Sequence, residues 1–490
     1  MLRRLFYLTL TVLLVSCGIQ KKTNNNSEYF RTKTDAIKAQ NIEQNLIPMY
    51  SVEGRVKRMT IPDMMKQDSI PGMSITFIDN GQIAWTKHYG YANLQDSIPI
   101  TSKTVFTGAS LSKPITAVAA LRLVEKGLLD LDKDVNLRLE DWKVPETELT
   151  KNEKVTLRRL IAHKAGIKND LWSSYLPDEK VPTLNQMLSG QKPSVDPATS
   201  VIFEPGSKSK YSNPGYSIIQ KLIMDVSNQD FDQIIQQLVF EPAGMNNSSF
   251  KQPIPDHLKQ RKALGYSKDL KPYPYRLFPY QAAGGIWTTP TDLAKFMIAL
   301  LNDHHKGTKT LLSKETTQSV FTKETMRYVF SLWNWGEDIV FQHSGSNQGF
   351  NCFMYGSIDK KQGIVVMTNS ENAFNSFDYI QRAVNDVYNW EYVKPEISKL
   401  AHKDLSWSHK YLGDYRWRGN DLRLLKQKDD LILRSGDETY VLKQTGAREF
   451  ILEEIPLKIT FSTNTEDNRM TIWGPGGGPS KLKKLNRNNR

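Results

Sequence analysis

The spacing of apolar residues predicts strands near both ends of a first folded region, with helices between them. Residues 73–78 alternate apolar and polar side chains, Asp79-Asn80-Gly81 predicts a turn, and residues 82–85 return, which together indicate a β-hairpin. Further strands are predicted at 338–341, 351–355 and 363–367, followed by a helix whose apolar residues Phe377, Ile380, Val384 and Tyr388 share one side.

A helix apolar nearly all round is predicted from Ile115 to Val124, ending near Gly127. Such a helix belongs in the interior of the protein. Strands at both ends with helices between them favour one sheet beside a helical region. The fold class predicted is therefore α+β rather than a doubly wound α/β sheet.

The pattern changes near residue 396. From there to the end, short apolar runs such as 431–433 and 450–452 alternate with turn residues, which predicts a small all-β, barrel-like unit. We therefore expect four parts: a signal segment at 1–17, a polar tether at 18–47, a main domain at 48–396 and a β-rich unit at 397–490. The tryptophans of this unit, Trp407, Trp417 and Trp473, are interpreted as core or rim residues rather than as a platform for a sugar.

Composition limits the class of protein. The chain has 490 residues, 39% of them hydrophobic, and a mean hydropathy of −0.49, which excludes a disordered tail and a polytopic membrane protein. The net charge of +13 favours contact with anionic surfaces such as membrane or wall polymer. No basic and aromatic residues interleave in a nucleic-acid-binding motif, so nucleic acid is not expected as a partner.

The two cysteines, Cys17 and Cys352, exclude a disulfide framework. Arg3 and Arg4 precede an apolar run too short to span a bilayer, which indicates a secretory signal. The ending at residues 14–17 resembles the lipobox of bacterial lipoproteins, which implies cleavage before Cys17, lipidation of its thiol and anchoring in the cell envelope. The alternative is a plain secreted protein. Cys352 is expected to be a buried apolar residue.

Ser110 and Lys113 are the first candidate catalytic residues. They stand three apart where the buried helix begins, so both side chains share one face. A serine hydroxyl needs a base, and a lysine can act as one only after burial has lowered its pKa from about 10.4. The same spacing arises by chance at ordinary helix starts, where Ser110 would be a cap.

Two further motifs strengthen this interpretation. Tyr211 and Asn213 precede a helical pattern and offer a phenol for proton transfer and an amide for a substrate carbonyl. His343-Ser344-Gly345-Ser346 is expected to follow a strand, where glycine allows backbone N–H groups close to a substrate. Each motif alone is more typical of a turn, but their order and spacing form a strong signal.

With these motifs, the chain resembles the serine β-lactamase-like and penicillin-binding protein superfamily, for which Ser-x-x-Lys is typical. The Tyr-x-Asn motif is similar to that of the branch containing class C β-lactamases, D,D-peptidases such as D,D-carboxypeptidases, D-aminopeptidases and related esterases. Flanking stretches at 70–73, 160–166, 242–245 and 283–289 also resemble that branch. The resemblance implies an antiparallel sheet flanked by helices with a helical subdomain, and an accessory β domain.

The resemblance also implies roles. Ser110 would be the acylated nucleophile, Lys113 its base and Tyr211 the proton relay. Asn213 would orient the acyl side of the substrate, and the backbone N–H groups of Ser110 and Ser346 would form the oxyanion hole.

The third motif departs from the Lys-Thr-Gly of penicillin-recognising members, because His343 replaces the lysine that holds a substrate carboxylate. We therefore expect a hydrolase of esters or amides, such as D-amino-acid peptides or wall fragments, with weak or absent β-lactamase activity. No cofactor is expected, and no residue cluster has metal-ligand spacing. The rival interpretation is a non-catalytic envelope lipoprotein that keeps the fold for binding.

Overall fold

The computed structural model describes residues 28–171, 173–322, 329–335, 338–392, 394–453, 455–464, 467, 469–474 and 479–485. The predicted signal segment and Cys17 lie outside these residues. Within the described ranges, no helix is both long and apolar enough to cross a membrane.

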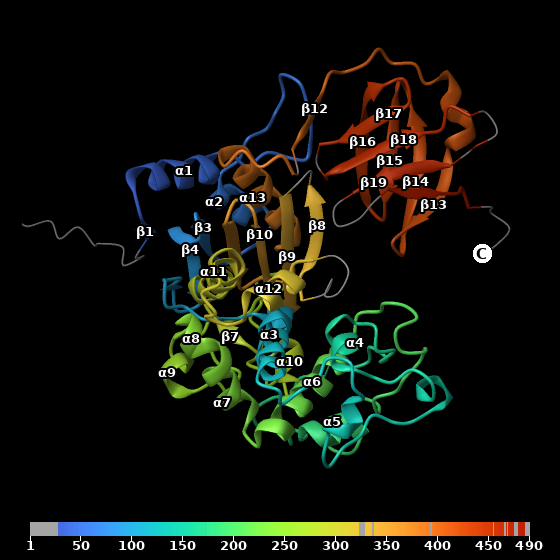
Figure 1. The fold of residues 1–490 in the computed structure, drawn as a ribbon. Helices are drawn as coiled ribbons and strands as arrows, with labels where there is room; N and C mark the ends of the chain where they lie inside the picture. Colours follow the sequence, from blue (N-terminus) through green and yellow to red (C-terminus); the bar gives the residue numbers. More distant parts are fainter. Residues whose placement is uncertain are drawn as a thin grey trace, which may run out of the picture.

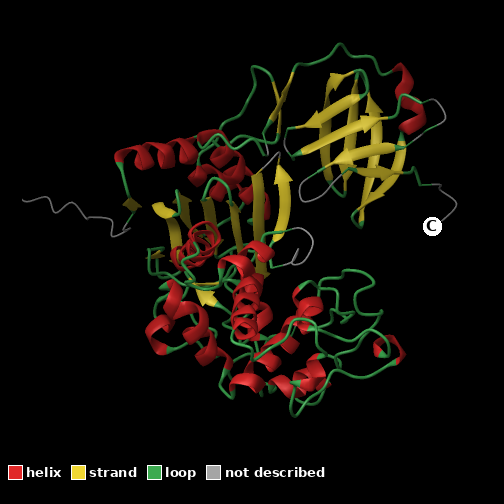
Figure 2. Ribbon diagram, in the orientation of Figure 1, coloured by secondary structure: helices red, strands yellow, loops and turns green. Residues whose placement is uncertain are grey.

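An antiparallel sheet forms the centre of the larger part of the molecule (Figures 1 and 2). Its strands lie in the spatial order β1 (Tyr29–Phe30), β4 (Gln82–Asn93), β3 (Gly72–Asp79), β11 (Gln362–Thr368), β10 (Phe350–Ser357), β9 (Asp338–Asn347) and β8 (Ser331–Trp335), with β5 (Ile98–Pro99) beside β4. The central strands β3, β10 and β11 are buried along nearly their whole length. This fits their apolar sequences, because both faces of the sheet are covered.

The predicted hairpin is confirmed. Ile78 pairs with Ile83 and Asp79 with Gln82, so the loop has two residues. Asn80 and Gly81 have φ of 55° and 68°, the left-handed geometry that matches the twist of the flanking strands.

Helices cover both faces of this sheet. On one face lie α1 (Lys33–Gln44), α2 (Ile61–Gln67) and α13 (Phe374–Val387), which share one buried cluster with the sheet. On the other face, α11 (Pro290–Lys306) packs on β3 and β11. Figure 1 shows these layers above and below the strands.

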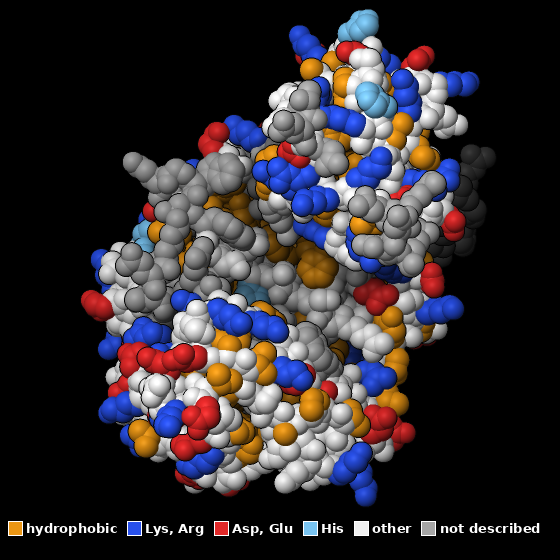
Figure 3. Space-filling view, turned by 90° about the vertical axis from the view of Figure 1, so that its right-hand side faces the viewer, with side chains coloured by type: hydrophobic (Ala, Val, Ile, Leu, Met, Phe, Trp, Pro, Cys, Tyr) orange, Lys and Arg blue, Asp and Glu red, His pale blue; other side chains and the backbone are white. Residues whose placement is uncertain are grey.

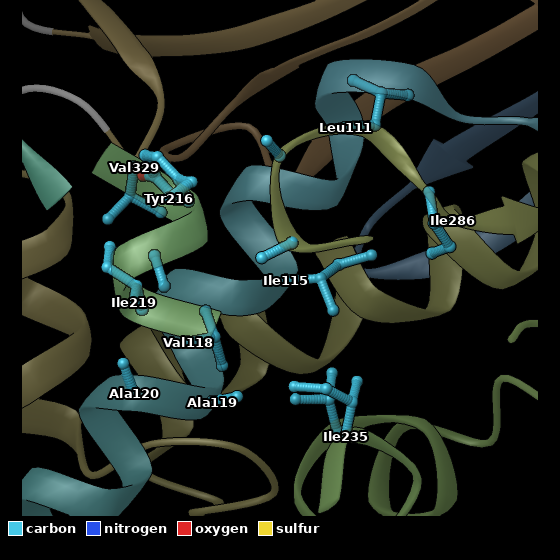
Figure 4. Close-up of a cluster of buried hydrophobic side chains, with 14 of the residues drawn as sticks. Leu111, Ile115, Val118, Ala119, Ala120, Tyr216, Ile219, Ile235, Ile286 and Val329 are labelled. Atoms are coloured by element: carbon cyan, nitrogen blue, oxygen red, sulfur yellow. The ribbon is translucent and has the colours of Figure 1, made fainter. Parts of the chain in front are cut away.

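The helical region lies beyond α11 and surrounds α3 (Ser112–Glu125). Its other helices are α4 (Leu157–Ile161), α5 (Leu184–Ser189), α6 (Asn213–Ser227), α7 (Phe231–Ile235), α8 (Glu241–Ala243), α9 (Asp256–Lys259), α10 (Gln281–Gly284) and α12 (Lys314–Val320). Residues from Ile115 to Leu121 on α3 are all buried, as the apolar pattern predicted. Figure 4 shows α3 packed beside α6, with Val118 and Ile219 in the same cluster.

The polar tether predicted for 18–47 is wrong over residues 29–47. This stretch forms β1, which pairs with β4, and helix α1, whose Ala39, Ile42 and nearby Leu46 are buried. Arg31 joins it to the sheet by donating hydrogen bonds to Asp35 and Asp79, both at 3.1 Å. The few apolar residues at helical spacing are therefore enough to stabilise this helix, because they pack against a face of the sheet.

The C-terminal unit is a second antiparallel sheet of eight strands, each paired with the next. They are β13 (Gly413–Trp417), β14 (Asn420–Gln427), β15 (Asp430–Ser435), β16 (Glu438–Gly446), β17 (Glu449–Leu452), β18 (Leu457–Phe461), β19 (Met470–Trp473) and β20 (Ser480–Leu482). Leu485 N–H donates to the Asp414 carbonyl at 2.8 Å, so the sheet nearly closes into a barrel. Its own cluster of apolar side chains fills the interior, which confirms the predicted α+β fold with an all-β unit.

A short parallel pair joins the two parts: β2 (Tyr50–Val52) with β12 (Glu396–Ser398). Tyr50 and Val52 also pack on Ile451 of the barrel, and Val52 N–H donates to the Glu453 carboxylate at 3.1 Å. The predicted boundary at 396/397 falls inside β12, so the linker is itself a strand.

Candidate active site

Ser110 lies in a single 3₁₀ turn (Ala109–Leu111) between strand β6 (Phe106–Thr107) and helix α3. Ala109 adopts φ of 46°, the left-handed region that non-glycine residues rarely occupy. Its N–H donates to the hydroxyl of Thr107 at 3.3 Å. Strain held in this way is typical of functional turns, and here it precedes the candidate nucleophile.

Lys113 occupies the first turn of α3, three residues after Ser110, and its side chain is fully buried. Its Nζ lies 3.1 Å from Ser110 Oγ and 2.5 Å from the Ala283 carbonyl oxygen, which comes from α10. The predicted pair is therefore within hydrogen-bond distance.

Burial holds the pKa of Lys113 well below its ordinary value, and no described carboxylate opposes that effect. The amine is surrounded by aromatic faces: the ring centres of Tyr211 and Tyr216 lie 4.8 and 5.7 Å from Nζ. A neutral amine has a lone pair. It can donate to the Ala283 carbonyl and accept the proton of Ser110 at the same time.

Tyr211 completes the hydrogen bonds around Ser110, since its hydroxyl donates to Ser110 Oγ at 2.9 Å. Desolvation raises the pKa of Tyr211 to about 12, against the smaller opposite effect of its bond to Ser110. The phenol therefore keeps its proton near neutral pH. The structure thus brings together Ser110 and Lys113 of the first motif and Tyr211 of the second.

His163 holds the segment that carries Tyr211. Its Nδ1 accepts the N–H of Ser212 at 3.2 Å, and its ring lies 4.5 Å from that of Tyr211. Desolvation is the main cause that lowers its pKa well below the usual value, so the ring is neutral and Nδ1 remains an acceptor. The contact of His163 with Tyr211 could not be inferred from the spacing of the two residues in the sequence.

Asn213 is buried at the first position of α6. Its Nδ2 donates to the Leu171 carbonyl at 3.3 Å, and its backbone N–H donates to Asn169 Oδ1 at 2.8 Å. The amide nitrogen is thus directed to the protein backbone. The predicted role of Asn213 in orienting a substrate stays a prediction.

The third motif lies inside strand β9, and the expectation that it follows a strand is wrong. Ser344, Gly345 and Ser346 pair with Phe353, Cys352 and Asn351 of β10. Serine, glycine and asparagine have weak strand preference, but the pairing with β10 overrides it. The motif therefore stands on a rigid element.

Gly345 permits a close approach between β9 and the nucleophile turn. A Cβ at this position would lie 2.5 Å from the Gly108 carbonyl oxygen and 3.0 Å from the Ser110 nitrogen. The backbone N–H of Ser110 therefore lies beside β9, as the predicted oxyanion hole requires. The Ser346 side chain accepts from Asn351 Nδ2 at 3.1 Å, and its backbone role stays a prediction.

His343 is uncharged at neutral pH. Desolvation is the main cause that lowers its pKa to about 4. Its Nδ1 lies 2.8 Å from the Ser344 carbonyl oxygen. A carbonyl can only accept, so Nδ1 carries the proton and Nε2 is the ring's acceptor. This residue cannot serve as a cation for a substrate carboxylate in the neutral range.

Asn347 and Cys352 support the site and were not singled out for it. Asn347 Nδ2 donates to the Thr107 hydroxyl at 2.8 Å and the Gly284 carbonyl at 3.0 Å, which ties the end of β9 to the nucleophile segment and α10. The Cys352 thiol, buried as predicted, donates to the Gly108 carbonyl at 3.0 Å. In the part of the chain that the structure describes, no cluster of three or more potential ligands could hold a metal ion.

Comparison with known proteins agrees with this geometry. The profile of the family described as Beta-lactamase matches residues 58–388. The protein named flp of Staphylococcus aureus (strain N315) is 26% identical over 371 residues, which cover 74% of this chain and 69% of that protein. Penicillin-binding protein 4* of Bacillus subtilis (strain 168) is 25% identical over 414 residues, covering 78% and 88%.

Two solved structures share the fold. The octameric penicillin-binding protein homologue from Pyrococcus abyssi superposes with a TM-score of 0.58 at 22% identity, covering 86% of this chain and 98% of that one. A structure of SurE gives a TM-score of 0.54 at 17% identity, covering 92% and 99%. Coverage of 92% extends beyond residue 396, so the likeness includes part of the C-terminal unit.

Proposed function

The chain belongs to the beta-lactamase family, and from that premise we propose that it is a serine hydrolase that forms an acyl-enzyme on Ser110. The observation that carries the proposal is the hydrogen-bonded group of Ser110, buried Lys113 and Tyr211. A protein that only binds its ligand has no chemical need for a fully buried lysine amine beside a serine. This group therefore disfavours the non-catalytic rival.

In the proposed acylation, neutral Lys113 takes the proton of Ser110 as Oγ attacks the substrate carbonyl. The new bond joins Ser110 Oγ to the carbonyl carbon, and the bond to the leaving group breaks. The backbone N–H groups of Ser110 and Ser346 would stabilise the oxyanion. The proton on Lys113 then returns through the Tyr211 hydroxyl to the leaving oxygen or nitrogen.

In the proposed deacylation, a water replaces the leaving group and loses its proton to the Tyr211 and Lys113 pair. Attack on the acyl carbon releases the acid and restores the Ser110 hydroxyl. Because the pKa of Tyr211 is raised to about 12, the phenol acts here as a relay that gives and receives a proton rather than as a standing phenolate.

The proposed substrates are esters or amides without a carboxylate next to the scissile bond. Neutral His343 supports this choice, since it takes the position of the lysine that holds a carboxylate in penicillin-recognising relatives. D-amino-acid peptides and wall fragments attacked at such bonds fit the class, with β-lactamase activity weak or absent. The proposed location is the cell envelope, through a lipid on Cys17.

Intact-mass measurement tests the proposal. We expect a p-nitrophenyl ester to acylate the wild-type protein and to be hydrolysed, and the Ser110→Ala variant to gain no mass and to lose hydrolysis. Benzylpenicillin in a parallel sample is expected to add mass slowly or not at all. Equal hydrolysis by the wild-type protein and Ser110→Ala would overturn the proposal.

A further inference from the structure

A cavity of about 560 Å³ lies between the main domain and the C-terminal barrel. Figure 3 shows a hollow between the upper and lower lobes of the molecule, with hydrophobic side chains inside it. On one side, α13 contributes Phe374, Asn375 and Asp378, and β9 contributes Gln342. On the other side, the tight β13–β14 hairpin contributes Trp417 and Asn420. The volume suits a ligand of two or three rings.

Aromatic side chains form much of the wall. Phe374 is 43% exposed although it stands on a helix whose other apolar residues are buried. Phe377 lies one helical turn further along the same face of α13 and also lines the cavity. Trp417 faces them from the barrel side. The sequence favoured a core or rim position for Trp417, and the structure places it at the cavity.

Polar side chains complete the wall of the cavity. The indole Nε1 of Trp417 is buried and makes no hydrogen bond within the described residues. The side-chain amides of Gln342, Asn375 and Asn420 also line the cavity, and those of Asn375 and Asn420 belong to exposed residues. Such amides can exchange hydrogen bonds with water for hydrogen bonds with a ligand.

These groups match a neutral, hydroxyl-rich ligand. Each amide offers a donor and an acceptor side by side, and so does each sugar hydroxyl. The lining carries one carboxylate, Asp378, and one guanidinium, Arg418, so it has no net charge to select an ion. The aromatic faces suit the apolar C–H face of a sugar ring. We propose that this cavity is a saccharide-binding site.

A peptide fits this lining less well. The main-chain N–H and C=O groups of an extended peptide form their hydrogen bonds best along a free strand edge. The polar groups here are instead side chains from a helix, a strand face and a hairpin turn. The saccharide is therefore the ligand class that the lining favours.

The cavity is preformed and lies close to the candidate active site. The β2–β12 pair and the contact of Val52 with Glu453 fix the barrel against the main domain, so no closure is needed. Ser344, which also lines the cavity, stands between His343 and Gly345 on β9. A bound saccharide would thus lie on the opposite face of the strand that approaches Ser110. The site does not require the proposed hydrolysis.

Titration calorimetry of the full chain carrying Ser110→Ala tests the proposal without turnover. The probe is chitotriose, with acetyl-D-alanyl-D-alanine as the peptide comparison. We expect chitotriose to bind, and Trp417→Ala to weaken it about tenfold, the loss expected for one aromatic stacking contact. Asn375→Ala, on the exposed face of a helix where alanine is well tolerated, is expected to weaken binding without affecting folding.

Trp473→Ala is the matched control, because this tryptophan is 41% exposed on the same barrel and does not line the cavity. The affinity of the Trp473→Ala variant for chitotriose should equal that of the Ser110→Ala protein without this second substitution. The proposal is overturned if chitotriose does not bind, if Asn375→Ala and Trp417→Ala both bind it normally, or if only the peptide binds. Ester hydrolysis by the wild-type protein is measured separately, so failure of binding and failure of catalysis remain distinguishable.

Discussion

The amine of Lys113 in the first turn of α3 lies 3.1 Å from the hydroxyl oxygen of Ser110 in the 3₁₀ turn that precedes this helix. The second partner of the amine is the Ala283 carbonyl, 170 residues away in sequence. The carbonyl holds the amine in place without adding a negative charge that would keep it protonated. The Ala283 carbonyl thus fixes the position of the Lys113 amine and also allows the amine to be neutral.

Replacing this base should lower activity and raise stability together. We expect Lys113→Met to reduce kcat for an ester by about 10² to 10⁴-fold, the usual contribution of a general base. The folded pKa of Lys113 lies well below its ordinary value, so burying this amine costs folding free energy at any pH below the ordinary lysine pKa. Methionine removes that cost, and the unfolding temperature should rise.

The stability gain of Lys113→Met should shrink as pH rises towards the ordinary lysine pKa, because the unfolded lysine then loses its own proton. Calorimetric scans of both proteins from pH 7 to 10 check this. A variant less stable than the wild type at pH 7 would contradict the assigned burial cost.

Introducing a cation at position 343, where penicillin-recognising relatives have a lysine, should change substrate preference. His343→Lys places an ammonium where a neutral ring now stands, and a charged hydrogen bond to a carboxylate should speed acylation by benzylpenicillin about tenfold. His343→Gln, which is neutral, is the control and should not do so. Time courses of intact mass measure both. Equal rates in the two variants would show that charge at this position does not limit acylation.

Adding one methyl group at Gly345 should disable the site. A Cβ there would approach the Gly108 carbonyl to 2.5 Å and the Ser110 nitrogen to 3.0 Å, which would displace the nucleophile turn from β9. We expect Gly345→Ala to lower kcat by about 10² to 10³-fold, as for loss of an oxyanion-hole donor. Gly54→Ala is the control, since Gly54 has φ of 75° with nothing within 4 Å. Its strain should cost about 1 kcal/mol of stability and leave kcat unchanged.

Asp338 should make the protein less stable as pH rises from about 4 to about 6. Desolvation, and then a hydrogen bond with Asp359, raise its pKa to about 6, and the Ser357 hydroxyl lies 2.8 Å from both of its oxygens. The folded state thus holds a proton that the unfolded state has already released, and this stabilisation is lost as pH passes the folded pKa. Asp338→Asn should be more stable than the wild type at pH 7.5 by about 1 kcal/mol. Urea unfolding at pH 4.5 and 7.5 measures the difference, and an equal effect at both values would count against the assigned proton.

Helix α1 should contribute to stability although its sequence is polar. Ile42 is fully buried, so Ile42→Ala should destabilise the protein by about 2 to 4 kcal/mol. Ile37, on the same helix, is 59% exposed, and Ile37→Ala should have an effect below about 0.5 kcal/mol. Thermal unfolding of the pair separates the two. Similar losses would mean that α1 does not pack as described.

The sequence predicted those features whose signal is local. The Ser110 and Lys113 spacing, the apolar helix that follows and the Asn80-Gly81 turn each depend on a few consecutive residues, and the structure has all of them. Helix α1 was missed because Ala39, Ile42 and Leu46 give too weak an apolar pattern without the sheet face that receives them.

Contacts between distant segments could not be predicted in this way. The Ala283 carbonyl beside Lys113 and the Nδ1 of His163 beside Ser212 depend on how separate helices pack. The strand that contains His343 was predicted to end too early, at residue 341. Pairing with β10, not local preference, extends it to Asn347. The neutral state of His343 likewise follows from its burial in the fold, and the Ser344 carbonyl decides only which ring nitrogen carries the proton.

The β2–β12 pair has a consequence for the order of folding. Residues 50–52 leave the ribosome early, but their partner strand at 396–398 follows only after the whole main domain has been made. Contacts of such long sequence separation form late and slowly. The main domain can therefore fold before strand β2 has its partner strand β12. During this stage the unpaired edge of β2 can form hydrogen bonds with other segments or other chains. Chaperones that bind nascent chains would act at this stage, and premature chain termination before residue 396 would leave the edge of β2 permanently unpaired.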